Sequence, residues 1–249
     1  MGVVLLWAQF TSGRADPPLP LVEIGAGRFM MGSPTAEFGR GIDEVQHEVT
    51  ITRPFFLGRF EVTQHDWRAV MGANPSHFGG CERCPVERVN YFEVREFLAR
   101  LNTGQREFVY RLPTEAEWEY GCRAGTTTPF NTGADLTAEQ ANYNGTFPYI
   151  GFRHGPNRER TTPVGSFAPN AWGLYDMHGN VWEWTADWYG PYPAGPAADP
   201  TGPRTGEKRV IRGGSWYFDA NSARCALRYT HAPQDRGFSL GFRVAADRR

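Results

Sequence analysis

The residues of this sequence best suited to chemistry are its four cysteines, because a thiolate is both a strong nucleophile and a soft metal ligand. Two of them stand together in GGCERCPVERV, as Cys81 and Cys84. The other two are single: Cys122 in EWEYGCRAG and Cys225 in RVIRGGSWYFDANSARCALRY. The last stretch combines a glycine turn with aromatic residues, like the wall of an active site, yet it holds only one thiol.

The spacing of Cys81 and Cys84 allows three interpretations. A Cys-x-x-Cys pair can be a redox pair, half of a zinc site or a small loop staple. No second such pair and no histidine pair at zinc-finger spacing follows, and no thioredoxin-like strand precedes it. We therefore expect a local disulfide, Cys81–Cys84, with a redox or metal-binding pair as the alternative.

Other catalytic patterns are missing from the sequence. Its six histidines form no H-E-x-x-H or H-x-H pattern, and there is no G-x-S-x-G. The single lysine, Lys208 in TGEKRVI, suits neither a Schiff base nor a phosphate loop. A dispersed iron site of two histidines and a carboxylate needs no local spacing, so iron stays open as a cofactor.

The charge pattern excludes one class of partner. The net charge is −1 and the basic residues form no run, which argues against nucleic-acid binding. No stretch of 18 apolar residues predicts a transmembrane segment. A short apolar run, Val3 to Ala8, lacks a basic region before it, and we interpret residues 1–21 as a leader and residues 22–249 as one domain. The run favours a periplasmic or secreted location, and a cytoplasmic one stays open.

The elements that position these residues are expected to be short. Gly 29 and Pro 19 make up about a fifth of the chain and predict a loop-rich domain. Alternation predicts a hairpin-like pair of strands in residues 22–33 and two more strands in 47–63, broken at Pro54. From residue 142 to 208 we expect mostly loop around one aromatic strand, NVWEWTADWYG. Capping residues predict three helices, which follow Thr63, Asn90 and Thr114. The helix after Asn90 carries Phe92, Phe97 and Leu98 at core spacing. Thr114 and Glu117 form a capping box at the start of the third helix.

Several motifs together resemble a known family. FMMGS, FEVTQHDWRAVMG, RLPTEAEWEYGCRAG, ANYNG, TTPVGSFAPNAWGLYDMHGNVWEWTADWYG, RVIRGGSW and GFRVA follow one another in this order. Over roughly residues 22 to 246 the chain resembles the formylglycine-generating enzyme, or sulfatase-modifying factor, family. The resemblance implies a single α+β domain with a variant C-type-lectin-like fold, little regular secondary structure and stabilisation by calcium.

The chain departs from that family where copper would bind. Members that oxidise a sulfatase cysteine to formylglycine hold copper(I) between two thiolates, its preferred soft ligands. The place of the first thiolate is Phe218 here, and the second falls in Asp219–Ser222, which has no cysteine. Copper and formylglycine generation by that mechanism are therefore not expected, unless Cys81 and Cys84 replace the missing pair.

The resemblance implies a structural role for Cys122 and Cys225. It implies a disulfide between Cys122 and Cys225, with a free nucleophile at Cys225 as the alternative. Leu98 and Val244 occupy the places of a second family disulfide as an apolar pair.

Calcium is the cofactor that the resemblance implies. In a first set, Asp176 and Glu183 would bind through side chains and Gly179 and Val181 through carbonyls; a buried Glu183 paired with an arginine is the alternative. In a second set the ligands would be Asn142, Tyr143, Asn157 and the Glu159 carbonyl. Calcium prefers six to eight oxygen ligands, which such loops can supply. We expect His178, between the first-set residues, to pack or hydrogen-bond rather than to bind metal.

Two functional hypotheses follow from these residues. The first is a divergent oxidative-maturation protein of the oxidoreductase type that makes no formylglycine. The second is a calcium-stabilised, C-type-lectin-like module that binds a peptide, protein, small molecule or glycan; a structural subunit that recruits an enzyme is a third interpretation. We expect a monomer. The candidate cleft residues are Ser215, Trp216, Phe218, Asp219, Arg228, Tyr229 and His231.

Overall fold

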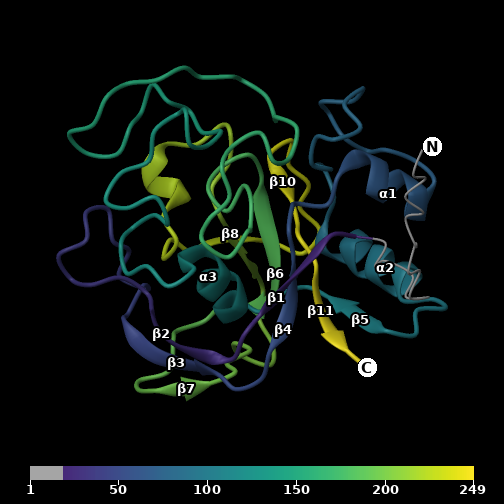
Figure 1. The fold of residues 1–249 in the computed structure, drawn as a ribbon, viewed down its shortest axis with the longest axis horizontal. Coiled ribbons are helices and arrows are strands. Elements are labelled where there is room, and N and C mark those ends of the chain that lie inside the picture. Colours follow the sequence, from purple (N-terminus) through teal and green to yellow (C-terminus); the bar gives the residue numbers. More distant parts are fainter. Residues whose placement is uncertain (1–18) are drawn as a thin grey trace, which may run out of the picture.

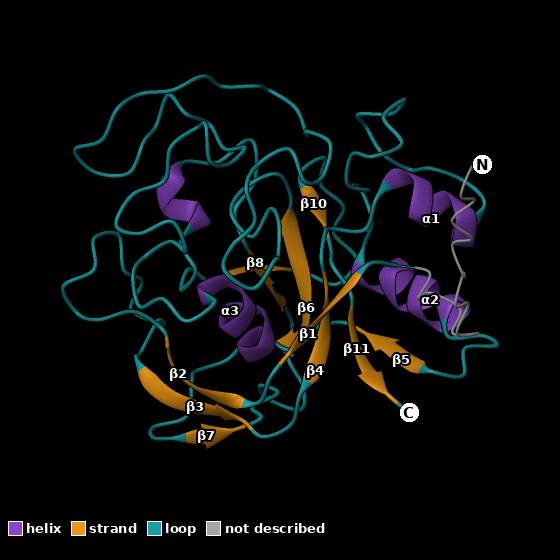
Figure 2. Ribbon diagram, in the orientation of Figure 1, coloured by secondary structure: helices purple, strands orange, loops and turns teal. Residues whose placement is uncertain are grey.

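The strands of the protein form three small sheets (Figures 1 and 2). The computed structural model describes residues 19–249, so the expected leader lies almost wholly outside it. The first sheet has the order β1-β4-β11-β5, the second β10-β6-β8-β9 and the third β2-β3-β7. The strands are β1 (Leu21–Ile24), β2 (Gly27–Met31), β3 (His47–Ile51), β4 (Phe55–Gly58), β5 (Phe108–Arg111), β6 (Trp182–Trp188), β7 (Ala197–Ala198), β8 (Arg209–Arg212), β9 (Tyr229–His231), β10 (Leu240–Gly241) and β11 (Ala245–Arg248).

The predicted hairpin in residues 22–33 does not form, although both of its strands exist. β1 pairs antiparallel with β4, whereas β2 pairs antiparallel with β3 in another sheet. At the start of β2, Gly27 lies so close to helix α3 (Glu115–Arg123) that an added Cβ would be 2.2 Å from the Tyr120 hydroxyl. β2 therefore lies against α3 and pairs with β3 instead of with β1.

All three α-helices begin at the predicted caps. They are α1 (Gln64–Met71), α2 (Tyr91–Leu101) and α3 (Glu115–Arg123), and each starts with a capping box. At Thr114, for example, the side chain accepts from the Glu117 amide while the Glu117 carboxylate accepts from the Thr114 amide. These reciprocal bonds satisfy amides that have no partner within the helix. None of the helices in residues 19–249 is long or apolar enough to cross a membrane.

The main core packs α1 and α2 against β5, β6 and residues 240–246. Trp184 and Phe97 are fully buried there, and Leu98 and Val244 join the same cluster, as the apolar pair of the sequence. Phe92 differs from the expectation, since it is 60% exposed. On a helix it lies on the opposite face from Val94 and Phe97, which contact the core.

A long irregular region links α3 to β6, as the glycine and proline content predicts. Between Arg123 and Trp182 the chain has no α-helix or strand, and Figure 1 shows it as loops that arch over one side of the molecule. A short 3-10 helix, Ala220–Ala223, lies on the same side. One attachment is the bond from the Ala220 amide to the Phe147 carbonyl, at 3.1 Å. The structure is thus a single mixed α+β domain with little regular secondary structure.

Candidate functional site

Phe218, which the family resemblance places at the first copper thiolate, is partly buried among other aromatic rings. Phe218 packs edge-on against the buried Trp182, with ring centroids 5.4 Å apart. Asp219 follows as the cap of the 3-10 helix, where its Oδ1 accepts from the Ser222 amide at 2.9 Å. Cys225 is bonded to Cys122, the pair that the resemblance implied. Because Cys81 is likewise bonded to Cys84, all four cysteines of the chain are in disulfides.

Around Phe218 lies an exposed group of aromatic rings, which we call the aromatic surface. Tyr217, Tyr229 and Phe238 are 56%, 45% and 43% exposed, and contacts among Tyr217, Phe238, Phe218 and Tyr229 gather these rings on one surface. Buried indoles support them from below: Tyr229 stacks on Trp182 at 5.4 Å, and Phe238 contacts Trp216 at 5.6 Å. The aromatic surface is defined by Trp216, Tyr217, Phe218, Tyr229 and Phe238.

A distant loop completes this surface, and the sequence analysis missed it. Phe78 stands edge-on to Trp216 with centroids 5.3 Å apart, and His77 lies 6.1 Å from the Phe238 ring. The loop is held by the buried Glu87, whose Oε1 accepts from the Phe78 amide at 2.8 Å. The contact between Phe78 and Trp216 joins segments more than a hundred residues apart, and no local pattern in the sequence predicts it.

His231 lies at the edge of the aromatic surface beside Tyr229, with ring centroids 6.0 Å apart. Its Nδ1 is 2.9 Å from Oδ2 of Asp235, and this hydrogen bond lowers the pKa of the Asp235 carboxyl. The carboxylate orients the ring and leaves Nε2 as its other polar atom. The pair thus provides the one histidine–carboxylate contact at this surface among residues 19–249.

Two of the candidate cleft residues lie elsewhere. Ser215 is buried beneath the aromatic surface. Arg228 is directed into the interior, where Nε and Nη2 bind both carboxylate oxygens of Glu115 at 2.7 and 2.8 Å. Its guanidinium also lies 3.9 Å from the centre of the Tyr192 ring. Such a buried, bidentate pair positions α3 and is not available to a ligand.

A second buried carboxyl lies next to this ion pair. Oδ2 of Asp187 accepts from the Glu115 amide at 2.8 Å, which anchors the first residue of α3. Burial, together with the negative charge of Glu115, raises the pKa of Asp187 to about 8. The Arg228 guanidinium has the opposite effect on Glu115, whose pKa is lowered despite its burial.

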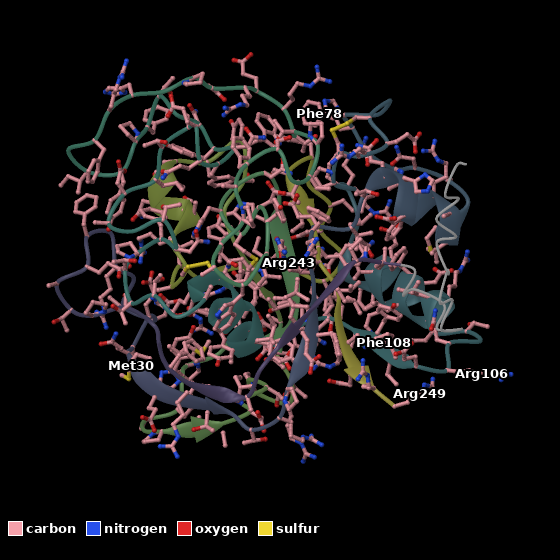
Figure 3. All side chains as sticks on the ribbon, viewed as in Figure 1. Met30, Phe78, Arg106, Phe108, Arg243 and Arg249 are labelled. Carbon is pink, nitrogen blue, oxygen red and sulfur yellow. A yellow bond between two sulfur atoms is a disulfide. The ribbon has the colours of Figure 1, made fainter. Side chains whose placement is uncertain are left out.

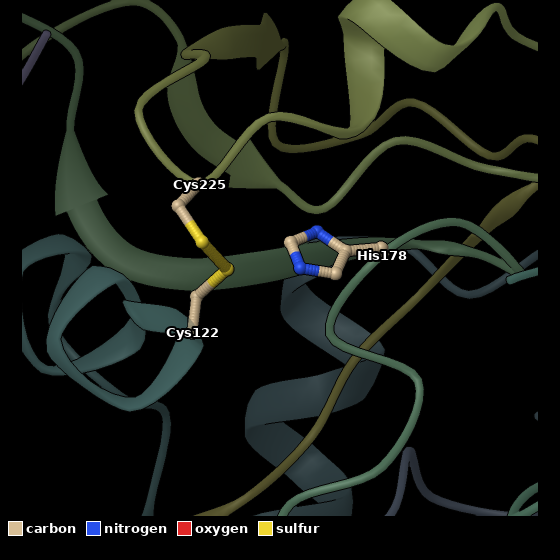
Figure 4. A group of neighbouring side chains, drawn as sticks. All are labelled: Cys122, His178 and Cys225. Atoms are coloured by element: carbon tan, nitrogen blue, oxygen red, sulfur yellow. A yellow bond between two sulfur atoms is a disulfide. The ribbon is translucent and has the colours of Figure 1, made fainter. Parts of the chain in front are cut away.

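The disulfide Cys122–Cys225 lies beside a histidine, and Figure 4 shows the His178 ring against the two sulfurs. Among residues 19–249 these three form the one group of three or more His, Cys, Asp or Glu whose ligand atoms lie within 4.8 Å of one another. His178 donates from Nδ1 to the Ala223 carbonyl and accepts at Nε2 from the Asn131 amide, and burial lowers its pKa to about 4. With both nitrogens and both sulfurs engaged, the group is structural.

In the first predicted calcium set, the Glu183 carboxylate is already paired with an arginine. Both Glu183 oxygens accept from Arg243, at 2.6 and 2.7 Å, and Oε2 also accepts from the Trp118 indole. This buried ion pair lies near the molecular centre, where Figure 3 labels Arg243. As arranged, the Glu183 side chain does not fit a role as a calcium ligand.

Two further buried carboxyls lie near Arg243. Asp176 is buried and accepts from the Gly165 amide at 2.7 Å, and burial raises its pKa to about 6. Glu61, which the sequence analysis did not single out, accepts from the Val181 amide, and burial raises its pKa well above the usual value. Three buried carboxyls therefore share one guanidinium.

The second predicted calcium set contains a free oxygen. Asn142 is fully buried and donates from Nδ2 to the Arg160 carbonyl at 2.9 Å, while its Oδ1 has no hydrogen-bond partner among the described residues. Asn157 and Glu159 belong to the same loop, in which Glu159 has a positive φ of 56°. An unpaired buried oxygen beside a loop is what an oxygen-binding cation would satisfy. Asn142 thus offers a free oxygen in the second set, whereas Oδ1 of Asn157 accepts from the Glu159 amide at 3.1 Å.

One large cavity lies away from the aromatic surface. It has a volume of about 1040 Å³ and is lined by α2, β5 and β11, including Arg95, Tyr110 and Arg248. None of the candidate cleft residues contributes to it. Its size alone assigns it no function.

Comparison with known proteins gives consistent matches. The family model described as the sulfatase-modifying factor enzyme 1-like domain matches residues 11–248. The formylglycine-generating enzyme of Streptomyces coelicolor is 37% identical over 191 residues, which cover 73% of this chain and 58% of that enzyme. The chain therefore spans less than two thirds of the enzyme. The chaperone protein LppX of Paenibacillus barcinonensis is 33% identical over 233 residues, which cover 76% of this chain and 79% of LppX.

Solved structures show the same relationship. PvdO from Pseudomonas aeruginosa is 35% identical with a TM-score of 0.80, over 91% of this chain and 94% of PvdO. Treponema denticola variable protein 1 is 29% identical with a TM-score of 0.78, over 90% and 94% of the two chains.

Proposed function

The chain belongs to the sulfatase-modifying factor family, and from that premise we propose that it binds a polypeptide at the aromatic surface without copper–thiolate chemistry. The observation that carries the proposal is the exposure of Tyr217, Tyr229 and Phe238 over a rigid base of buried tryptophans. Aromatic side chains on a preorganised support lose little entropy on binding and dominate protein interfaces. The name of the relative LppX, a chaperone protein, supports a polypeptide as the ligand.

The absence of copper–thiolate chemistry is part of this proposal, and the positions of the cysteines support it. Copper(I) prefers soft ligands, and by the family resemblance Phe218 stands where the first thiolate would be. Cys225 cannot substitute, because its sulfur is bonded to Cys122 at full burial. Two disulfides also favour an oxidising compartment, outside the cytoplasm.

We propose calcium at the second set, with Asn142 Oδ1 as a ligand beside Asn157 and the carbonyls of Tyr143 and Glu159. Bound there, calcium would contribute positive charge and close coordination to a loop. The protein residues themselves hold the loop through the bond from Asn142 to the Arg160 carbonyl. This role is structural and requires no step in a reaction.

Binding can be tested with reduced, carboxymethylated α-lactalbumin, a permanently unfolded polypeptide. We expect fluorescence anisotropy to show binding by the wild type and a loss of about tenfold in affinity for Tyr217→Ala/Tyr229→Ala. The control is Phe92→Ala, because Phe92 is 60% exposed on α2, outside the aromatic surface, and should bind unchanged. Absence of wild-type binding, or an equal loss in the control, would refute the proposal.

The missing copper chemistry has a separate test. After loading with copper(I) and dialysis, mass spectrometry should find no stoichiometric copper, and a cysteine peptide from a sulfatase should remain unconverted. One tightly bound copper per chain would overturn this part of the proposal and would implicate Cys81 and Cys84 after reduction.

A further inference from the structure

The two disulfides of the chain lie in different surroundings. Cys122 and Cys225 are fully buried and connect residues 103 apart. The Cys81–Cys84 disulfide closes a turn of three residues, with Cys81 partly exposed and Cys84 only 4% exposed. Cys81 is therefore the more accessible residue of the two, an asymmetry suited to attack at one defined sulfur.

The Cys81–Cys84 turn is joined to the aromatic surface through Gln64, the first residue of α1. The Gln64 amide donates to the Cys84 carbonyl at 2.9 Å, and its side-chain Nε2 donates to the Phe78 carbonyl at 3.1 Å. Phe78 in turn contacts Trp216. Figure 3 shows the sulfur–sulfur bond next to the Phe78 label. A polypeptide held on the aromatic surface would thus lie close to the disulfide.

Charged side chains flank the Cys81–Cys84 turn. Glu82 and Arg83 separate the cysteines, and Glu82 forms ion pairs with Arg68 and, at 3.6 Å, with His65. Arg68 and His65 therefore both contact the Glu82 carboxylate, which follows Cys81 directly in the chain. Positive neighbours stabilise the anionic sulfur that disulfide exchange must release.

We propose that Cys81–Cys84 is a thiol–disulfide exchange site that oxidises pairs of cysteines in a polypeptide bound at the aromatic surface. The inference rests on the proposed function for its substrate. Such a site would allow the protein to oxidise its substrate, and so to act in oxidative maturation, without copper.

The exchange balances in atoms and electrons. A substrate thiolate attacks Sγ of Cys81, the Cys81–Cys84 bond breaks, and the electron pair leaves on Cys84, which takes a proton. The second substrate thiolate then attacks the substrate sulfur of the mixed disulfide, and Cys81 leaves as a thiolate and is protonated. The substrate dithiol loses two electrons and two protons, which the cysteine pair gains. A small disulfide such as oxidised glutathione restores Cys81–Cys84 by the reverse exchange.

The first experiment uses small thiols, so that it does not depend on polypeptide binding. The folded wild type is titrated with dithiothreitol, and alkylation with mass spectrometry reports each disulfide. We expect Cys81–Cys84 to be reduced at least about tenfold faster than Cys122–Cys225, which serves as the internal control. Equal rates, or reduction only on unfolding, would overturn the proposal.

Two single variants test the assigned roles. Cys84→Ser leaves Cys81 as a free, accessible thiol, whereas Cys81→Ser leaves the shielded Cys84. With oxidised glutathione, the mixed disulfide should form at least about tenfold faster in Cys84→Ser. Equal or reversed rates would contradict attack at Cys81.

A third measurement separates exchange from binding. Catalytic amounts of wild type should accelerate oxidation of a reduced two-cysteine peptide by oxidised glutathione, and Cys81→Ser/Cys84→Ser should not. The double variant should still bind carboxymethylated α-lactalbumin. If it binds while the wild type shows no acceleration, only the exchange site is refuted. If small-thiol exchange occurs and no polypeptide binds, the proposed function fails instead.

Discussion

Replacing Asp187 with asparagine should stabilise the protein by an amount that grows with pH. The Asp187 carboxyl is 3% exposed, and its Oδ2 accepts from the Glu115 amide at the start of α3. Burial and the neighbouring Glu115 charge raise its pKa to about 8, with Glu117 adding repulsion and Arg228 opposing it. Asparagine keeps an oxygen for the amide but cannot ionise.

The magnitude follows from proton linkage. In the unfolded chain an aspartate titrates near pH 3.9, so between about pH 4 and pH 8 the unfolded state has released a proton that the folded state retains. The free energy of unfolding then falls as pH rises, by up to about 1.4 kcal/mol per pH unit from this group. Between pH 5 and pH 7 the Asp187→Asn variant should gain about 2.7 kcal/mol relative to wild type.

The assay is urea denaturation of both proteins at pH 5, 6 and 7, followed by tryptophan fluorescence. Taking the difference between variant and wild type at each pH removes the titration of all other groups and any pH-independent cost of the amide. Asp247→Asn is the matched control. Arg111 lowers the pKa of Asp247, so its stabilisation is present above pH 4 and lost only in more acidic solution.

A constant difference for Asp187→Asn across this range, within about 0.5 kcal/mol, would refute the argument that burial keeps this carboxyl protonated at neutral pH. The Asp247→Asn difference should stay constant there.

Three further predictions concern the disulfides, the buried Arg243–Glu183 ion pair and the proposed calcium site. Cys122→Ala/Cys225→Ala should cost about 3 kcal/mol more in urea unfolding than Cys81→Ala/Cys84→Ala, because chain entropy grows with the logarithm of loop length, 103 residues against 3; equal costs would contradict this. Arg243→Gln should lose about 3–5 kcal/mol by the same assay, since it leaves Glu183 buried beside two other carboxyls, and a loss under 1 kcal/mol would show that the pair is dispensable. Asn142→Leu should lose one calcium per chain by mass spectrometry and should abolish any shift in Tm caused by EGTA, whereas unchanged calcium would exclude Asn142 as a ligand.

Helix starts could be predicted from the sequence because their causes are local. Thr63, Asn90 and Thr114 cap helices through residues only three positions away. The aromatic strand β6 and the irregular region before it are likewise predicted by composition and alternation over short windows. Such signals do not depend on how the rest of the chain folds.

Pairing between distant segments could not be predicted in this way. The strands β1 and β2 are adjacent in sequence, yet each pairs with a different strand, and β2 packs closely on α3 where Gly27 meets Tyr120. The ordered motifs nevertheless identified the family from the sequence, since they conveyed a known arrangement that periodicity alone could not supply.

The sequence by itself determined which chemical groups the protein has: four cysteines, no cysteine at Phe218 or in Asp219–Ser222, and a glycine turn between Asp176 and Glu183. Only the tertiary structure decided which charges meet. With 26 basic residues, all but Lys208 being arginine, nothing local shows that Arg228 pairs with Glu115, 113 positions away, or that Arg243 pairs with Glu183. The physical reason is that desolvation and ion pairing act between groups brought together by the folded core, whereas capping and alternation act between neighbours along the chain.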